Sequence, residues 1–159
     1  MNGGTGPWSR PLRCGQGLLL LSLLLLLAAC ERPWTPGSTQ VARGSALFAV
    51  HCAKCHGSAG VGQDPSDPFG SADPVRGFVA PALDGQGHCA DHAPGELLTL
   101  IERGSPVAGS PMVGLANRLE PAEMKAIIAY LYRLWPRPIQ RLYEQRHRDE
   151  LRSLLPPGV

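Results

Sequence analysis

The sequence predicts a small all-α domain that follows a removable leader. Apolar residues recur at helical spacing in three segments, 41–51, 95–103 and 121–135. No stretch of useful length shows the alternation expected of a strand. The 159 residues are enough for one modest domain with a hydrophobic core.

The first 29 residues have the features of a signal peptide. Arg10 and Arg13 precede an unbroken run of apolar or small residues at positions 17–29. A spanning helix needs ~20 such residues. The run is therefore too short to cross a membrane and is typical of a signal-peptide core, with an uncleaved anchor as the alternative.

The leader ends with the residues LAAC, of which the last is Cys30. This ending resembles the bacterial lipoprotein signal, in which the cysteine becomes the acylated first residue of the mature protein. The resemblance implies an exported protein anchored by lipid to a bacterial membrane and facing the periplasm, because more than one acyl chain anchors a protein firmly. Glu31 is similar to the residue at this place in lipoproteins passed on to an outer membrane. The alternative is ordinary secretory cleavage beside a chance cysteine.

Residues 30–40 are polar and contain proline and glycine, so we expect a flexible tether. The first helix is expected to begin near Val41. One face of this helix follows the i, i+3, i+4, i+7 pattern with Gly44, Leu47, Phe48 and His51.

Two loops and two further helices are expected after the first helix. Residues 57–79 are rich in Gly, Pro, Ser and Asp and show no apolar period, which predicts a long loop that wraps a bound group or moves. Pro94 precedes a short helix over residues 95–103. A second loop leads to a helix over residues 121–135, which stops before Pro136.

Residues 136–159 form a basic C-terminal extension. From Arg133 onward there are six arginines and three acidic residues. Apolar residues lie near helical spacing, so the extension is an extra helix, an interaction arm or a frayed tail. The frayed tail is the default expectation for a chain end.

The charge pattern excludes a nucleic-acid-binding protein. Without the leader, the chain has 13 basic and 13 acidic residues, and residues 44–132 have five basic and nine acidic ones. The basic end is short, and aromatic residues do not interleave with it in a stacking pattern. The acidic central region instead predicts a partner protein with a positive docking face.

The stretch HCAKCHG carries the main functional signal, because Cys52, Cys55 and His56 lie within five residues. A cysteine pair at this spacing is compatible with a redox dithiol, half of a zinc site or a haem attachment site. A thioredoxin-type dithiol needs a βαβ setting, which the sequence does not predict. Haem attachment explains every residue, because two thiols add to the two vinyl groups and the histidine ligates the iron.

A zinc site needs further ligands, and the candidates are His88, Cys89 and His92. The two histidines are four residues apart and are also rivals for an iron ligand. The same residues suggest an accessory copper site or a hydrogen bond to a haem propionate. An ordinary structural role is the simplest alternative.

The attachment motif and a methionine-bearing loop before the last helix make residues 41–135 resemble a class I cytochrome c. The resemblance implies a fold in which the N- and C-terminal helices cross over one covalently bound haem c and long loops wrap that haem. It implies thioether bonds from two cysteines, a proximal histidine, a distal methionine and a proline carbonyl that accepts the imidazole N–H; these residues are Cys52, Cys55, His56, Met112 and Pro81.

Residues at the expected helix crossing also match the family. Gly44 and Phe48 stand where the family has a glycine and an aromatic residue, and Tyr130 and Leu131 stand on the helix that crosses them. A glycine at a crossing lets two backbones approach closely, which offsets its cost of ~1 kcal/mol inside a helix. Met124 is expected to pack in the core.

Two protein ligands leave no open iron position, so substrate chemistry at the iron is blocked and electron transfer remains. We therefore expect a lipid-anchored periplasmic monohaem electron carrier, not an enzyme, with a redox protein donor and acceptor as partners. One alternative is the haem-bearing subunit of a larger periplasmic oxidoreductase. Another is a cytochrome domain with an accessory copper site at His88 and His92.

Overall fold

The computed structural model describes Met1 and residues 35–73, 75 and 77–155. The described residues between Thr35 and Leu155 belong to one compact unit. The predicted signal peptide, Cys14 and the predicted lipidation site Cys30 lie outside the described residues. Residues 30–34 of the predicted tether also lie outside the described residues.

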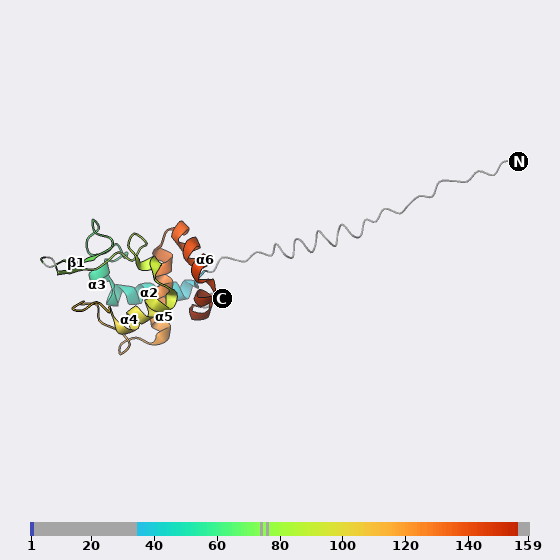
Figure 1. Cartoon of the computed structure of the whole chain (residues 1–159). Helices are drawn as coiled ribbons and strands as arrows, with labels where there is room; N and C mark the ends of the chain where they lie inside the picture. Colours follow the sequence, from blue (N-terminus) through green and yellow to red (C-terminus); the bar gives the residue numbers. More distant parts are fainter. Residues whose placement is uncertain (2–34, 74, 76, 156–159) are drawn as a thin grey trace. The chain divides into compact units, whose positions relative to one another are not determined.

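The described residues are mostly helical, as predicted, and contain one very short hairpin (Figure 1). The elements in chain order are α2 (Ser38–His51), α3 (Ala53–His56), β1 (Ser71–Asp73), β2 (Gly77–Val79), the 3-10 helix η1 (Cys89–Asp91), α4 (Pro94–Arg103), α5 (Pro121–Leu134) and α6 (Arg137–Leu154). Helix α2 begins at Ser38, three residues before the predicted start near Val41.

The hairpin corrects the prediction that the 57–79 segment is all loop. Its strands pair antiparallel with Ala72 opposite Phe78. Gly77 enters β2 with a φ of 75°, a conformation that glycine adopts without a steric penalty. Three-residue strands are too short to show an alternating pattern in the sequence, which is why periodicity did not reveal them.

Helices α2 and α5 cross in backbone contact, as the family resemblance implies. A Cβ atom on Gly44 would lie only 1.9 Å from the carbonyl oxygen of Ala126 and 2.9 Å from the Cβ of Tyr130. Beside this contact, the rings of Phe48 and Tyr130 pack with centroids 5.3 Å apart. The crossing thus fixes the end of α2, from which the cysteine motif continues.

Helices α4 and α5 begin with the same pair of residue types, a proline at the first position and a glutamate two residues later. Pro94 and Pro121 occupy the start of each helix, where the missing N–H costs nothing. Two residues further on, the carboxylates of Glu96 and Glu123 accept hydrogen bonds from the backbone N–H groups of Ala93 and Glu120, both at 2.9 Å. Both helices start within a residue of their predicted bounds, and Met124 is buried in the core as predicted.

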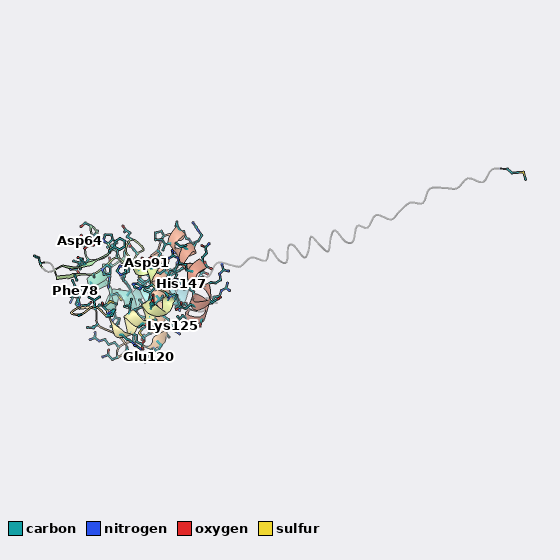
Figure 2. All side chains as sticks on the ribbon, in the orientation of Figure 1. Asp64, Phe78, Asp91, Glu120, Lys125 and His147 are labelled. Carbon is teal, nitrogen blue, oxygen red and sulfur yellow. The ribbon has the colours of Figure 1, made fainter. Side chains whose placement is uncertain are left out.

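The C-terminal extension is a packed helix and not a frayed tail. Helix α6 buries Tyr143, Leu151 and the following Leu155, none of which is more than 2% exposed. Its backbone departs from helical geometry at His147, with φ −125° and ψ 24°. Figure 1 shows α6 at the opposite end of the unit from the hairpin, and Figure 2 places Phe78 and His147 accordingly. The default expectation was wrong because tertiary packing stabilises an end that local sequence leaves undecided.

Helix α6 still presents its positive charges to solvent. Its exposed residues include four arginines, Arg137, Arg141, Arg146 and Arg152. Within the part of the chain that the structure describes, no helix is both long enough and apolar enough to span a bilayer.

Candidate functional site

The end of α2 and the single turn of α3 bring the two thiols and the imidazole of the motif together. The carbonyl oxygen of Cys52 accepts hydrogen bonds from the backbone N–H groups of Cys55 at 3.1 Å and His56 at 3.0 Å. Cys52 is half-buried, Cys55 is exposed and His56 is buried, and both cysteines are free thiols. One helical turn therefore presents all three reactive side chains.

The imidazole of His56 has a fixed orientation. Its Nδ1–H donates a hydrogen bond of 2.8 Å to the carbonyl oxygen of Pro81. This bond assigns the ring proton to Nδ1 and leaves Nε2 with a lone pair, which is the form that binds a metal. Burial lowers the pKa of His56, and the bond to Pro81 opposes that shift only in part. The ring is thus held neutral and ready to act as a ligand.

The carbonyl of Pro81 is held in place by the loop that precedes it. The backbone N–H of Ala82 donates to the carbonyl oxygen of Pro68 at 2.8 Å, and that of Leu83 donates to Gly60 at 2.6 Å. The backbone N–H of Gln63 donates to the carbonyl oxygen of Ala80 at 3.0 Å. The side-chain oxygen of Gln63 accepts from the backbone N–H of Ala80 at 3.1 Å. The long loop therefore serves to position the acceptor of the His56 hydrogen bond.

The environment of the cysteine pair does not suit a dithiol oxidoreductase. Reactive dithiols have a thiol whose pKa is lowered so that it ionises near neutral pH. Here burial, and secondarily the neighbouring Cys55, raises the pKa of Cys52 to about 11. Cys52 therefore stays protonated at neutral pH, which does not suit it as the attacking thiol of a redox pair.

Met112 lies in the loop between α4 and α5, as predicted. Its backbone carbonyl accepts from Ser105 N–H at 3.0 Å, and its N–H donates to the Ser110 hydroxyl at 3.3 Å. Its side chain is 38% exposed, whereas that of Met124 is 4% exposed. Met124 is thus part of the core, whereas Met112 is accessible in its loop to a bound group.

Large apolar side chains are exposed in the two loops that flank the motif. A Cβ on Gly109 would lie 3.6 Å from the ring of Phe78, so these loops meet at that point. Exposed apolar side chains that gather in one region can mark a ligand-binding surface. A large apolar cofactor fits this surface and the available donors; the exposed side chains in these loops are Val61, Phe69, Val75, Val107, Met112 and Val113.

His88, Cys89 and His92 do not assemble as metal ligands. Cys89 is 4% exposed within the hydrophobic core, and burial raises its pKa to about 12. The rings of His88 and His92 pack at 5.4 Å, and His88 stacks on Phe69 at 6.4 Å, a contact that the sequence did not reveal. Among the described residues, no three His, Cys, Asp or Glu side chains form a possible metal site. The structure therefore gives no support to a zinc site or a three-ligand copper site here.

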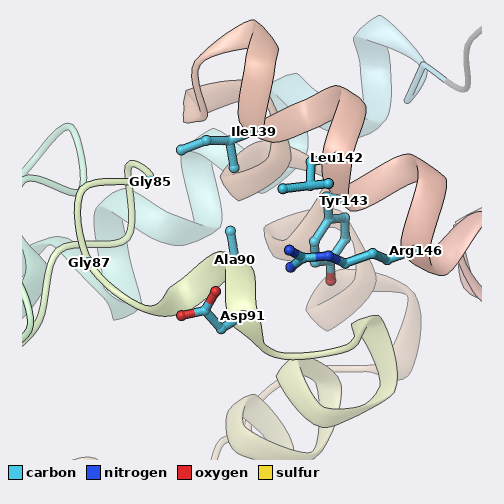
Figure 3. A pocket seen from close by; sticks show the side chains of 8 residues that line it. All are labelled: Gly85, Gly87, Ala90, Asp91, Ile139, Leu142, Tyr143 and Arg146. Carbon is cyan, nitrogen blue, oxygen red and sulfur yellow. The ribbon is translucent and has the colours of Figure 1, made fainter.

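A small pocket lies between η1 and α6 (Figure 3). Its volume is about 130 Å³. Asp91 faces it from the η1 side, and Arg146 and Tyr143 face it from α6. Cys52, Cys55, His56 and Met112 are not among its lining residues, so it is separate from the candidate site.

Comparison with known protein families decides between the remaining alternatives. The family model for cytochrome c matches residues 41–135, which is more than half of the chain. The chain belongs to the cytochrome c family. No curated protein matches it significantly. Membership implies that this cytochrome binds haem c covalently and acts in haem-based electron transfer.

Helix α6 lies wholly outside the matched residues. The family match ends at residue 135, and α6 begins at Arg137. The extension thus lies beyond the matched family domain and packs against its core.

Proposed function

We propose that this cytochrome is a lipid-anchored, periplasm-facing monohaem electron carrier. The observation that carries the proposal is the geometry of one helical turn. Cys52 and Cys55 project from this turn as free thiols, and His56 beside them is fixed by Pro81 with Nε2 available. No other described segment combines two thiols and an oriented imidazole in this way.

In this proposal, Cys52 and Cys55 hold one haem through thioether bonds, and His56 and Met112 ligate its iron. When bound, the haem supplies one-electron chemistry between the ferric and ferrous states. The hydrogen bond to Pro81 keeps the His56 ring from rotating and makes it a stronger electron donor. With His56 and Met112 both ligating the iron, the haem would offer no site for a substrate and would supply electron transfer alone, which suits a carrier and not an enzyme.

Redox proteins are the proposed partners of this carrier. The region from residue 44 to 132 has nine acidic and five basic residues, which suits a donor or acceptor with a positive docking face. Complementary charge mainly speeds the encounter of two proteins and adds less to their affinity. Such a surface therefore suits brief electron exchange.

Replacing Met112 with leucine tests the distal ligand. The haem should remain attached, because both thioether bonds are untouched, but its reduction potential should fall. Thioether ligation raises the potential, so we expect a loss on the order of 100 mV, which is about two powers of ten in the redox equilibrium. The far-red absorption band of methionine-ligated ferric haem should disappear. Spectroscopy and redox titration measure both effects.

Met124→Leu is the matched control, because this methionine is buried in α5 and leucine conserves its volume. It should leave the spectrum and the potential as they are. An unchanged far-red band in Met112→Leu would remove Met112 from the iron.

The lipid anchor rests on the LAAC ending at Cys30, which lies outside the described residues. The mature protein should begin at Cys30, carry the mass of its acyl chains and partition into detergent. A Cys30→Ser variant should lose the acyl mass and stay in the aqueous phase. Cys14→Ser should change neither property, since that residue is removed with the leader. Intact mass spectrometry and detergent phase separation check these outcomes.

A further inference from the structure

The segment that carries Pro81 is held from two sides. On one side it is hydrogen-bonded to the 57–70 loop, through the backbone N–H groups of Ala82 and Leu83. On the other side, the indole N–H of Trp135 donates to the carbonyl oxygen of Leu83 at 2.9 Å. Leu83 lies only two residues after Pro81. The indole thus holds a carbonyl group two residues along the chain from the acceptor of the His56 hydrogen bond.

Trp135 is in turn held by the first turn of α6. Helix α5 ends at Leu134, so its last carbonyl groups have no partner within the helix. Pro136 has no N–H with which to continue the chain of hydrogen bonds. The side-chain amide of Gln140 donates to the carbonyl oxygen of Tyr132 at 3.0 Å and to that of Trp135 at 2.9 Å, and so caps the end of α5.

Gln140 and Trp135 are both inaccessible to solvent, with exposed fractions of 4% and 2%. Hydrogen bonds shielded in this way compete little with water and resist opening. The ring of Trp135 also packs edge-on against Tyr143 of α6, with centroids 4.7 Å apart. The indole therefore has little freedom to leave the Leu83 carbonyl.

We propose that Gln140 and Trp135 are positioning residues for the iron ligand His56, so that helix α6, outside the family domain, tunes the haem. The connection runs from Gln140 to Trp135, from Trp135 to the Leu83 carbonyl, and along two residues of backbone to Pro81. This inference rests on the proposed role of His56. It goes beyond that role because it assigns a redox function to the C-terminal extension.

Loss of the indole N–H of Trp135 should shift the reduction potential of the haem in one direction. Loosening the 81–83 segment weakens the hydrogen bond from His56 Nδ1–H to Pro81. A histidine with a weaker hydrogen bond donates less electron density to iron, which disfavours the ferric state. The reduction potential should therefore rise when the indole N–H is removed.

Trp135→Phe in the full mature protein is the principal test. The variant keeps an aromatic ring but loses the N–H, so the potential should rise above that of the wild type. Exchange of the Ala82 and Leu83 amide hydrogens should accelerate by about tenfold or more, because the segment opens more often. Gln140→Met keeps the side-chain volume and removes the amide that donates to Tyr132 and Trp135. It should raise the reduction potential and the exchange rate as well, but by less than Trp135→Phe does.

Tyr143→Phe is the control for packing in the same aromatic cluster. Its hydroxyl is buried and has no hydrogen-bond partner, so its removal alters no bond in the connection. Potential and amide exchange should match the wild type. A wild-type potential and exchange rate in Trp135→Phe, with only a lower unfolding midpoint, would reduce Trp135 to a structural residue and overturn the proposal. An equal shift in Tyr143→Phe would overturn it too.

The proposed haem and the proposed positioning role are tested by different measurements. Haem content, measured by pyridine haemochrome, reports on the attachment to Cys52 and Cys55. Amide exchange at Ala82 and Leu83 reports on the connection to Trp135 whether or not haem is bound. A protein without haem would contradict the proposed function, and slow exchange in Trp135→Phe would contradict this inference.

Discussion

Gly44→Ala is expected to destabilise this cytochrome by about 2 kcal/mol or more, although alanine is the better helix former. The exchange gains ~1 kcal/mol of helix propensity. Against this gain, the new Cβ would lie 1.9 Å from the carbonyl oxygen of Ala126, and a backbone atom cannot move aside as a side chain can. Forcing α2 and α5 apart costs about 3 kcal/mol or more, which exceeds the gain. Denaturant unfolding of the full mature protein measures the difference.

Ser45→Ala is the control for propensity, because it adds no atom to the crossing and lies in the same turn of α2. It should leave stability within about 0.5 kcal/mol of the wild type or raise it slightly. A Gly44→Ala protein as stable as Ser45→Ala would show that the two helices do not meet in backbone contact.

Replacing both Cys52 and Cys55 with alanine is expected to abolish covalent haem attachment. Each thioether bond needs one cysteine sulfur, and the described part of the chain contains just one further thiol, Cys89. Its sulfur is buried in the core with a pKa raised to about 12, so it cannot substitute. Haem staining after denaturing electrophoresis and intact mass should show a loss of essentially all attached haem.

Cys89→Ala should keep one haem per chain, since Cys89 lies apart from the motif. Cys89→Ala therefore tests whether haem attachment depends on the two motif cysteines or on the loss of any thiol. Haem that survives denaturation in the double variant, or that is lost in Cys89→Ala, would refute the assignment of Cys52 and Cys55. Because Cys89 is buried, it also cannot bridge two folded copies of the chain.

Local features of the sequence were sufficient for several parts of the site. The spacing of Cys52, Cys55 and His56 predicts three side chains on one turn, because backbone geometry alone brings close neighbours together. Pro121 and Glu123 mark the start of α5 for the same local reason. The expected all-α fold is confirmed, and the helix bounds lie within a few residues of those predicted.

Contacts between distant segments were beyond local reasoning. The pattern of residues 136–159 was compatible with a helix, an arm or a tail. Burial of Tyr143 and Leu151 against the core stabilises the helix. The hydrogen bonds of Trp135 to Leu83 and of Gln140 to the end of α5 left no trace in spacing or composition. Likewise, the stacking of His88 on Phe69 joins residues whose separation in sequence carries no signal.

The sequence by itself determined the chemistry of this protein, because thiols and an imidazole act through their identity and short spacing. Only the tertiary structure decided how that chemistry is held: which nitrogen of His56 is free, which loop fixes Pro81, and that α6 completes the core. These depend on long-range packing, in which a hydrogen bond of 2.8 Å joins residues 25 positions apart. Such contacts follow from the global free-energy minimum of the chain and not from any local preference.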